Sequence, residues 1–550
     1  MIRDELRQVL GRAVEAAQKD GELPAIAVPD ILIERPSGEG HGDYASSLPL
    51  KMARSARMAP MTIAGIIAAK VELPAAVAGL EVAAPGFLNF HLASAWLGDQ
   101  VDQIVAAGPD YGRVDLGGGR RVQVEFVSAN PTGPLTAGNG RGAALGDSLA
   151  RVLSKAGYQV QREYYVNDAG NQMDAFNGSV YARYVQRFGG AVELPENGYP
   201  GDYIQTVAEA IATSHGRQFL DVPAEEAKPM LGRLGVDLLL QQIRIDLDQL
   251  GIRFDEWFHE ESLFEAGKVS AAVEHLRAAG YVLEREGATW FASSTLGDDR
   301  DNVLIRSNGV PTYFASDAAY HQNKLGERKF DKVIDIWGAD HQGHVPRMKA
   351  VVEAMGFDPA RLAVLIYQLV NLVRDGQVVR MGKRTGQFVT LREVLDEVGP
   401  DAVRFFMVAR SPDAMMDFDL DLAKAQSDVN PVYYVQYAHA RTGGILRRAE
   451  NIDFGDGDVT LLIDSSELAL IRKMLELPEI VADAAQALAP HPLPHYAQEL
   501  ATALHTFYDR CRVITEDAET TKARLKLVAA CKATLAATLD LIGVGAPEQM

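Results

Sequence analysis

The stretch "EFVSANPTGPLTAGNGRGAALGD", residues 125–147, decides the fold class because it carries a strand pattern into a glycine-rich turn. Gly138, Gly140, Gly142 and Gly146 lie where this turn becomes a helix. The unpaired N–H groups at a helix start attract anions, and glycine lets a phosphate approach the backbone. A plain tight turn explains the pattern equally well, and it matches neither the Lys-Ser/Thr phosphate loop nor the dinucleotide fingerprint.

The segments around this turn predict a doubly wound α/β domain. The strand "RVQVEFVS" precedes the turn, a helical pattern starts at about 140, and "YQVQREYYV" alternates as the next strand. A strand, a helix and a strand in this order form a βαβ unit with parallel strands. Further strands are expected at 332–338 and 362–373, and Asp375-Gly376 is expected to form a two-residue hairpin turn.

The chain as a whole predicts three domains. We expect an α+β N-terminal domain at 1–112, a parallel-sheet domain at 113–425 and an all-α bundle at 426–550. A mostly helical insertion is expected at about 174–300. Because the bundle has its own helical periodicity, we expect deletion from about 430 onward to leave a folded sheet domain.

Composition limits the partners and the compartment. The net charge of −20 excludes a generally basic nucleic-acid coat, so any RNA must be bound by local basic patches. Two cysteines, Cys511 and Cys531, are too few for a disulfide framework or a usual zinc site, and buried thiols in a reducing compartment fit them. The N-terminus does not resemble a signal peptide, and no run of about 18 apolar residues occurs. We therefore expect a cytoplasmic protein without a membrane partner.

Three other segments carry candidate chemistry. In "VVRMGKRTGQF", Lys383 and Arg384 lie between glycines, where they either close over a triphosphate or form a solvated basic loop. In "TYFASDAAYH", Tyr313 and Asp317 share a helix face, and a carboxylate beside an aromatic ring suits a guanidinium group. A surface cap by the aspartate is the alternative. In "WGADHQGH", two histidines lie three apart without a third ligand, so no metal site is expected.

Taken together, these segments resemble the arginyl-tRNA synthetases, which are class I aminoacyl-tRNA synthetases. The resemblance covers nearly the whole chain and includes "HGDYASS", "APGFLNF", "YYVNDAGNQ", "YPGDYI" and "NPVYYVQYAHAR". It implies an N-terminal domain that contacts the tRNA elbow, a Rossmann-like catalytic domain and a helical anticodon-binding domain. It also implies an enzyme that uses ATP, with Mg²⁺, to form arginyl-adenylate from L-arginine. The arginine is then transferred to the 3′-terminal ribose of arginine tRNA.

Bound tRNA is generally required for the first step in this family, and the resemblance further implies a monomer without a tightly bound metal. Two signatures depart from the family pattern. The family usually has His-x-Gly-His where this chain has Thr136, Ala137, Gly138 and Asn139. Both replacements can donate hydrogen bonds, but neither can carry a positive charge. Where the family usually has Lys-Met-Ser-Lys-Ser, residues 380–384 retain the second lysine as Lys383. We therefore expect an active enzyme.

The resemblance assigns roles to individual residues. The catalytic residues are Thr136, Gly138, Asn139 and Lys383. ATP is assigned to Pro131, Thr132, Gly133, Thr136, Gly138, Asn139, Arg141, Met381 and Lys383. Arginine is assigned to Glu125, Asn130, Tyr313 and Asp317, and a rigid pair of carboxylates around its guanidinium would reject lysine. For tRNA we expect Tyr434, Arg441, Arg447 and Arg448, with Lys522, Arg524 and Lys526 as further basic candidates. The resemblance assigns no particular contact to Asp340, His341 or His344.

Two other functions remain open from the sequence. A catalytically weak tRNA-binding paralogue is suggested by the missing histidines and the acidic charge. A nucleotidyl transferase that acts on a small substrate would leave the helical C-terminal third without a role.

Overall fold

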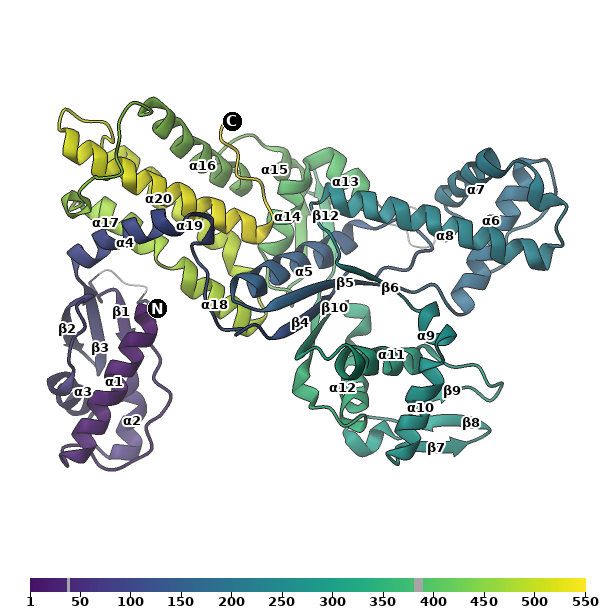
Figure 1. The fold of residues 1–550 in the computed structure, drawn as a ribbon, viewed down its shortest axis with the longest axis horizontal. Helices are drawn as coiled ribbons and strands as arrows, with labels where there is room; N and C mark the ends of the chain where they lie inside the picture. The colour runs from purple at the N-terminus through teal and green to yellow at the C-terminus, as the bar shows by residue number, and fades with distance from the viewer. Residues whose placement is uncertain (37–39, 380–388) are drawn as a thin grey trace.

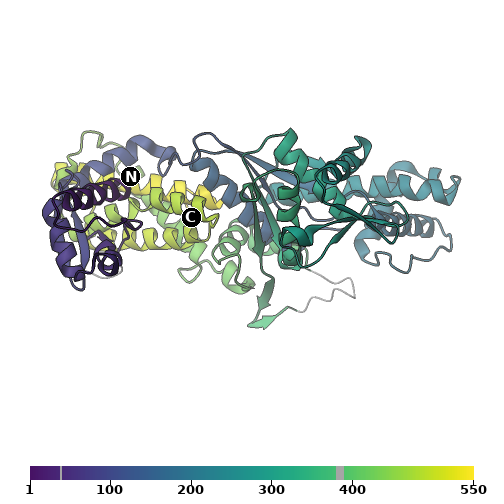
Figure 2. The same ribbon diagram turned by 90° about the horizontal axis from the view of Figure 1, so that it is seen from below.

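The computed structural model describes residues 1–36, 40–379 and 389–550. Figure 1 shows an elongated molecule with a parallel sheet near its middle. The N-terminal domain and a helical bundle lie towards one end, and three helices of an insertion lie at the other. Figure 2 shows the same order from below, with the first and last parts of the chain side by side.

The central sheet is parallel, as the βαβ pattern predicts. Its strands run in the order β11-β10-β4-β5-β6, and every neighbouring pair is parallel. The bounds are β4 (Arg121–Glu125), β5 (Gln159–Val166), β6 (Glu256–His259), β10 (Lys332–Gly338) and β11 (Leu362–Tyr367). Helix α5 (Ala137–Lys155) connects β4 to β5 and is the predicted crossover. Side chains that follow the strands therefore meet at the carboxyl edge of the sheet.

The region expected as one insertion is divided by strand β6. Before it come three helices, α6 (Asn171–Arg187), α7 (Asp202–His215) and α8 (Ala224–Gln249). After it come α9 (Glu261–Glu265), α10 (Lys268–Ala278) and the antiparallel sheet of β7 (Val282–Arg285), β8 (Ala288–Phe291) and β9 (Asn302–Ile305). Strand β6 has only four residues at the edge of the sheet, so its sequence carries no clear alternation.

Two helices, one before and one after β10 in the chain, pack near this part of the parallel sheet. They are α11 (Tyr313–Gln322), which continues into a π-helical turn at Asn323–Glu327, and α12 (Val345–Ala354). Together with α10 they surround a smaller apolar core, separate from the main one. This core holds α11 against the parallel sheet.

The segment 362–373, expected as one strand, forms two strands in different sheets. Strand β11 ends the parallel sheet, whereas β12 (Val370–Arg374) pairs with β13 (Gln377–Val378) and β14 (Met416–Asp419). The turn between β12 and β13 is Asp375-Gly376, and both residues have positive φ, which confirms the predicted hairpin. Helices α13 (Leu391–Val398), α14 (Pro400–Val408) and α15 (Leu420–Lys424) complete this region.

The N-terminal domain combines helices with a three-stranded antiparallel sheet of order β1-β3-β2. Its elements are α1 (Ile2–Lys19), β1 (Tyr44–Ser46), α2 (Leu48–Ala56), α3 (Pro60–Lys70), β2 (Val77–Ala83) and β3 (Phe87–Leu92). The next helix, α4 (Ser94–Ala107), lies against the C-terminal bundle (Figure 1).

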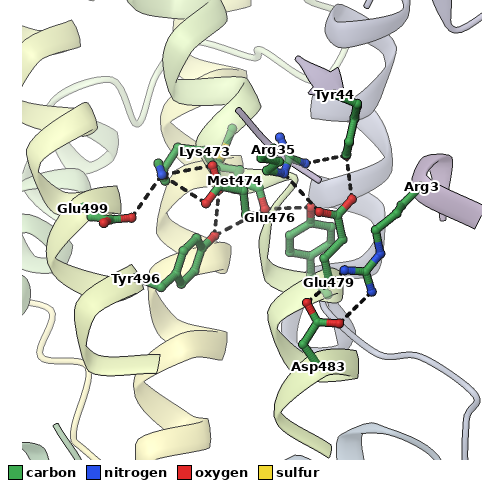
Figure 3. Close-up of polar contacts among 11 residues, drawn as sticks. Arg3, Arg35, Tyr44, Lys473, Met474, Glu476, Glu479, Asp483, Tyr496 and Glu499 are labelled. Carbon is green, nitrogen blue, oxygen red and sulfur yellow. Dashed lines mark hydrogen bonds and ion pairs between the residues drawn. The ribbon is translucent and has the colours of Figure 1, made fainter. Parts of the chain in front are cut away.

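Charged side chains join the N-terminal domain to the bundle (Figure 3). Arg3 makes two 2.8 Å hydrogen bonds to Asp483. The Glu479 carboxylate accepts from Arg35 at 3.0 Å and from the buried Tyr44 hydroxyl at 2.5 Å. Tyr44 belongs to the segment "HGDYASS", so part of that segment faces the bundle.

The chain after 425 is helical, as its periodicity predicts. The bundle consists of α16 (Pro431–Arg448), α17 (Ser465–Met474), α18 (Leu477–Ala487), α19 (Pro492–Arg510) and α20 (Ala518–Ile542). Its apolar core is continuous with that of the sheet domain. The fully buried Arg404 guanidinium also binds the Ile542 carbonyl and Asp147. A cut at about 430 would expose this shared core, so we now expect the deletion to destabilise the sheet domain, contrary to the expectation from sequence that it leaves a folded sheet domain.

Candidate active site

Helix α5 begins with a capping box between two predicted catalytic residues. The Thr136 hydroxyl and the Thr136 backbone N–H each donate a 2.8 Å hydrogen bond to the Asn139 side-chain oxygen. The Asn139 N–H in turn points to the Thr136 hydroxyl. Such a box satisfies N–H groups that a helix start leaves unpaired and fixes its direction. The two residues at the family's histidine positions are therefore in mutual contact.

The glycines of the opening stretch divide into two kinds. A Cβ at Gly142 would lie 2.9 Å from the Tyr367 ring, and one at Gly146 would lie 2.2 Å from Phe126. At Gly140 the obstacle is Leu391, at 2.8 Å. At Gly138 the nearest atom is the Thr136 hydroxyl oxygen, 3.6 Å away. Three of the glycines thus allow close packing of α5, and Gly138 is the one that leaves room beside the helix start.

The loop between β4 and α5 has an unusual backbone. Val127 and Ser128 have φ values of +67° and +37°, which side-chain-bearing residues, and β-branched ones above all, rarely adopt. The Ser128 hydroxyl donates to Glu125 at 3.0 Å and accepts from the Tyr165 N–H at 3.1 Å. Asn130 accepts from the Asn167 amide at 3.3 Å. Backbone strain held by such contacts is typical of binding sites.

Two acidic side chains, Glu260 and Asp317, lie near the start of α11. Glu260 follows β6, is 2 % exposed and lines a pocket with Gly170, Tyr313 and Ser316. Burial raises the pKa of Glu260 to about 7, and the nearby Asp317 carboxylate adds to the shift. Burial also raises the pKa of Asp317, against the pull of His321 and Arg347. Within the described residues, neither carboxylate takes part in a salt bridge. The two carboxylates suit a cationic ligand, and Arg306 is the cationic side chain that also lines this pocket.

The sequence predicted Tyr313 and Asp317 but missed Glu260. Tyr313 is 45 % exposed at the mouth of the pocket, and Asp317 lies one turn further along α11. Glu260 is separated from both by more than 50 residues and reaches them because β6 ends at the same edge of the sheet. The only sequence signal was an acid directly after a short aromatic strand, which is informative once the parallel topology is known.

Several residues predicted to bind substrates have other partners. The buried Arg141 guanidinium donates 2.8 Å hydrogen bonds to the carbonyls of Gln368, Ser411 and Ala414. Glu125 is held by the Lys324 ammonium at 2.5 Å. We therefore expect the side chains of Arg141 and Glu125 to support the backbone and the helices around the site rather than to contact a ligand.

The other predicted ATP residues lie in the loop before α5 or beyond the described parts. Pro131 and Thr132 are buried, and Gly133 lies against the Tyr203 ring. Met381, Lys383 and Arg384 lie outside the described residues. Asp340 and His341 are exposed after β10, with the rings of His341 and His344 5.4 Å apart.

A cationic and aromatic face lies between α16 and α19. The Arg441 guanidinium lies over the Tyr437 and Tyr508 rings, at 5.1 and 4.7 Å, and beside His505. Tyr434 lines a neighbouring pocket, and Arg447 and Arg448 are exposed, although Arg447 lies 3.6 Å from the Glu548 carboxylate. The remaining basic candidates pair with acids of the fold: Lys522 with Asp456, Arg524 with Glu467 and Lys526 with Asp102. The face around Arg441 is the better place for an RNA contact.

Three family models match consecutive parts of the chain. Residues 2–92 match "Arginyl tRNA synthetase N terminal domain", 100–443 match "tRNA synthetases class I (R), catalytic domain", and 435–550 match "DALR anticodon binding domain". The parallel sheet, its insertions and the helical bundle thus define a class I aminoacyl-tRNA synthetase.

Similar proteins identify the family. The chain is 50 % identical to the arginine–tRNA ligase of Dehalococcoides mccartyi (strain ATCC BAA-2100 / JCM 16839 / KCTC 5957 / BAV1), over 100 % of this chain and 99 % of that one. It is 48 % identical to the arginine–tRNA ligase of Carboxydothermus hydrogenoformans, over 99 % of this chain and 98 % of that one. The chain belongs to the arginyl-tRNA synthetase family.

Solved structures show the same architecture. A putative arginyl-tRNA synthetase from Campylobacter jejuni has a TM-score of 0.77 at 34 % identity and covers 84 % of this chain with 100 % of its own. The Thermus thermophilus arginyl-tRNA synthetase has a TM-score of 0.80 over the full length of both chains, at 24 % identity, and it shares the fold. The chain is an enzyme that joins arginine to tRNA with ATP as a substrate, and neither alternative function is favoured. In the described residues, no helix is long and apolar enough to cross a membrane.

Proposed function

We propose that the pocket beside α11 binds the guanidinium group of L-arginine. Asp317 and Glu260 receive its N–H groups, and the Tyr313 ring packs against its plane. Asn130, on the strained loop after β4, binds the amino-acid end. The single observation that carries this assignment is the approach of the Asp317 carboxylate to Glu260 beside the pocket that Glu260 and Tyr313 line, since neither carboxylate forms a salt bridge among the described residues.

This arrangement favours arginine over lysine for a physical reason. A guanidinium fork can donate to two carboxylates at once, whereas a single ammonium leaves acceptors unpaired. Leaving a buried carboxylate unpaired is costly.

We infer that ATP, together with Mg²⁺, lies at the start of α5. Gly138 leaves room there, and Thr136 and Asn139 direct the helix start towards the phosphates. Lys383 neutralises the charge that develops on pyrophosphate as the arginine carboxylate attacks the α-phosphorus. The ribose hydroxyl of the tRNA 3′ end then attacks the resulting adenylate. We expect bound tRNA to be required for the first of these steps.

We propose that the three domains 1–112, 113–425 and 426–550 have separate roles in binding and catalysis. The first contacts the tRNA elbow, the second holds the reacting groups, and the third binds the anticodon through Tyr434, Arg441, Arg447 and Arg448. We also propose that the protein is a cytoplasmic monomer, since two buried free thiols suit a reducing compartment. Light scattering coupled to gel filtration tests the monomer.

Arginine-dependent ATP–pyrophosphate exchange, measured with and without tRNA, tests the proposed function. Exchange that requires L-arginine and tRNA, and that is not supported by L-lysine, is the expected result. Exchange with lysine at comparable efficiency would refute the proposed pocket.

A further inference from the structure

A row of acidic side chains crosses the central sheet beneath α11. Strand register places Asp335 of β10 beside Glu125 of β4, and Glu125 beside Glu163 of β5. Asp335 and Glu163 are fully buried, and Glu125 is 7 % exposed. Neighbouring carboxylates repel one another, and burial makes the repulsion stronger. The row therefore needs cations from the helix that covers it.

The end of α11 supplies these cations. The helix continues into a π-helical turn, Asn323–Glu327, which contains Lys324. The Lys324 ammonium, with no exposed surface, lies 2.5 Å from Glu125 and 2.9 Å from Asp335. His321 meets the other Asp335 oxygen at 2.9 Å, and its second ring nitrogen faces the Asp317 carbonyl at 2.8 Å. The Tyr320 hydroxyl, within α11, and Arg328, directly after the π-helical turn, hold Glu163. The end of this one helix thus provides partners for the carboxylates of three neighbouring strands.

The same helix carries the arginine pocket at its other end. Tyr313 and Asp317 lie on its first turns, and Lys324 lies 11 residues after Tyr313, about 16 Å along a helix. Although burial opposes its charge, Asp335 and Glu125 keep the pKa of Lys324 above its ordinary value. Burial raises the pKa of Glu125, and Lys324 is the main group that opposes that shift. The lysine is charged, and its position fixes α11 on the sheet.

We propose that Lys324 is a positioning residue for arginine recognition. Its ammonium pairs with Glu125 and Asp335, and Asp317 and Glu260, which form no salt bridge among the described residues, remain to receive the guanidinium group. This inference rests on the proposed arginine pocket and deepens it. Without the Lys324 ammonium, Glu125 and Asp335 become adjacent unpaired carboxylates, α11 shifts on the sheet, and Asp317 loses its alignment with Glu260.

Four variants of the full chain test this role, with L-arginine binding measured by equilibrium dialysis in the presence of tRNA. Lys324→Met should weaken L-arginine binding by about tenfold or more, with the KM for ATP in pyrophosphate exchange nearly unchanged. The double variant Lys324→Met with Glu125→Gln should regain part of that loss, because one unpaired charge is removed. Lys332→Met, on the same sheet but at the amino end of β10, is the matched control and should bind normally. Glu125→Gln alone should weaken L-arginine binding less than Lys324→Met does, because the Lys324 ammonium keeps Asp335 as a partner.

The outcomes separate this inference from the proposed pocket. Equal losses for arginine and ATP, without rescue by Glu125→Gln, would make Lys324 a purely structural residue and overturn the inference. If Lys324→Met does not fold, Glu125→Gln decides alone: a loss as large as that of Asp317→Asn would place Glu125 on the ligand and refute its pairing role. If Asp317→Asn binds L-arginine normally, the proposed pocket itself fails, whatever the Lys324 variants do.

Discussion

Thr136 donates its hydroxyl hydrogen to the side-chain oxygen of Asn139 at 2.8 Å, so the two residues at the family's histidine positions contact each other. The Asn139 amide nitrogen can still donate a hydrogen bond to a phosphate, whereas the single hydroxyl hydrogen of Thr136 is already donated to Asn139. The first role of the pair is to begin α5. The capping box couples the stability of the helix start to the geometry of the proposed ATP site.

Thr136→Ala should therefore affect both stability and catalysis. We expect the free energy of unfolding to fall by about 1 kcal/mol, the usual cost of a lost cap. We also expect pyrophosphate exchange to slow by about tenfold, less than the loss of a main transition-state donor. Asp464→Ala removes the same kind of cap from α17 and is the control. If it slows exchange as much, the effect of Thr136 is only one of stability.

Asp317→Asn should raise the KM for L-arginine far more than the KM for ATP. It removes the charged half of a desolvated guanidinium pair, a loss of about 2 to 5 kcal/mol. Steady-state pyrophosphate exchange with each substrate varied in turn measures this. Glu261→Gln, an exposed acid beside the pocket, should change neither constant. Equal increases in both KM values would contradict the assignment of Asp317 to arginine.

Arginine affinity should depend on pH through Glu260. The pKa of Glu260 is about 7, so the side chain is mostly neutral at pH 6 and mostly a carboxylate at pH 8. Because arginine stays cationic, its affinity should rise with pH, by up to about tenfold per pH unit below the pKa. Glu260→Gln should flatten this part of the profile. Dialysis between pH 6 and pH 8 provides the measurement, and an unchanged slope in Glu260→Gln would assign the titration to another group.

Ionisation of Glu260 should lower the free energy of unfolding as the pH rises, whereas it should raise the affinity for arginine. Folding raises the pKa of Glu260 from 4.5 to about 7, so folding favours the protonated form. Its contribution to stability is complete below pH 4.5 and disappears as the pH rises through 7. The free energy of unfolding of Glu260→Gln should fall less than that of the unmodified protein between pH 5 and pH 8, as measured in urea.

Lys383→Ala should slow adenylate formation and leave L-arginine binding nearly intact. The lysine lies outside the described residues, and the prediction rests on its place in the family signature. A residue that acts only as charge develops on pyrophosphate lowers the rate without changing ground-state binding. Rapid-quench measurement of the first turnover tests the rate, and dialysis tests the binding. Loss of arginine binding would show that this segment has a structural role.

tRNA binding should depend on the face around Arg441 despite the net charge of −20. Arg441→Gln should weaken tRNA binding and reduce the slope of log affinity against log salt by about one. L-Arginine binding in the absence of tRNA should not change. Arg253→Gln, at an exposed site in the sheet domain, is the control. Filter binding at several salt concentrations provides the test, and a slope equal to that of the unmodified protein would move the RNA surface elsewhere.

The local parts of the fold were predictable because short-range patterns determine them. Residues close together in the sequence determine each of these features. They are the alternation of β4 and β5, the helical periodicity of α5 and the turn at Asp375-Gly376. Tyr313 and Asp317 could be paired from the sequence for the same reason, since they lie one turn apart on one helix. The periodicity of the last third likewise predicted helices.

Contacts between distant segments could not be predicted, because strand order and register have no local signature. The register that aligns Asp335 with Glu125 made Lys324 a buried partner of both, and only the position of β6 brought Glu260 to Asp317. The carbonyls around Arg141 likewise come from segments more than 200 residues away. The amino-acid sequence was therefore sufficient to predict the helices and the longer strands, but not β6 or the division of 362–373 into β11 and β12. Which of these carboxylates are paired internally, and which form no salt bridge among the described residues, follows from the tertiary structure, because burial and pairing depend on every neighbour at once.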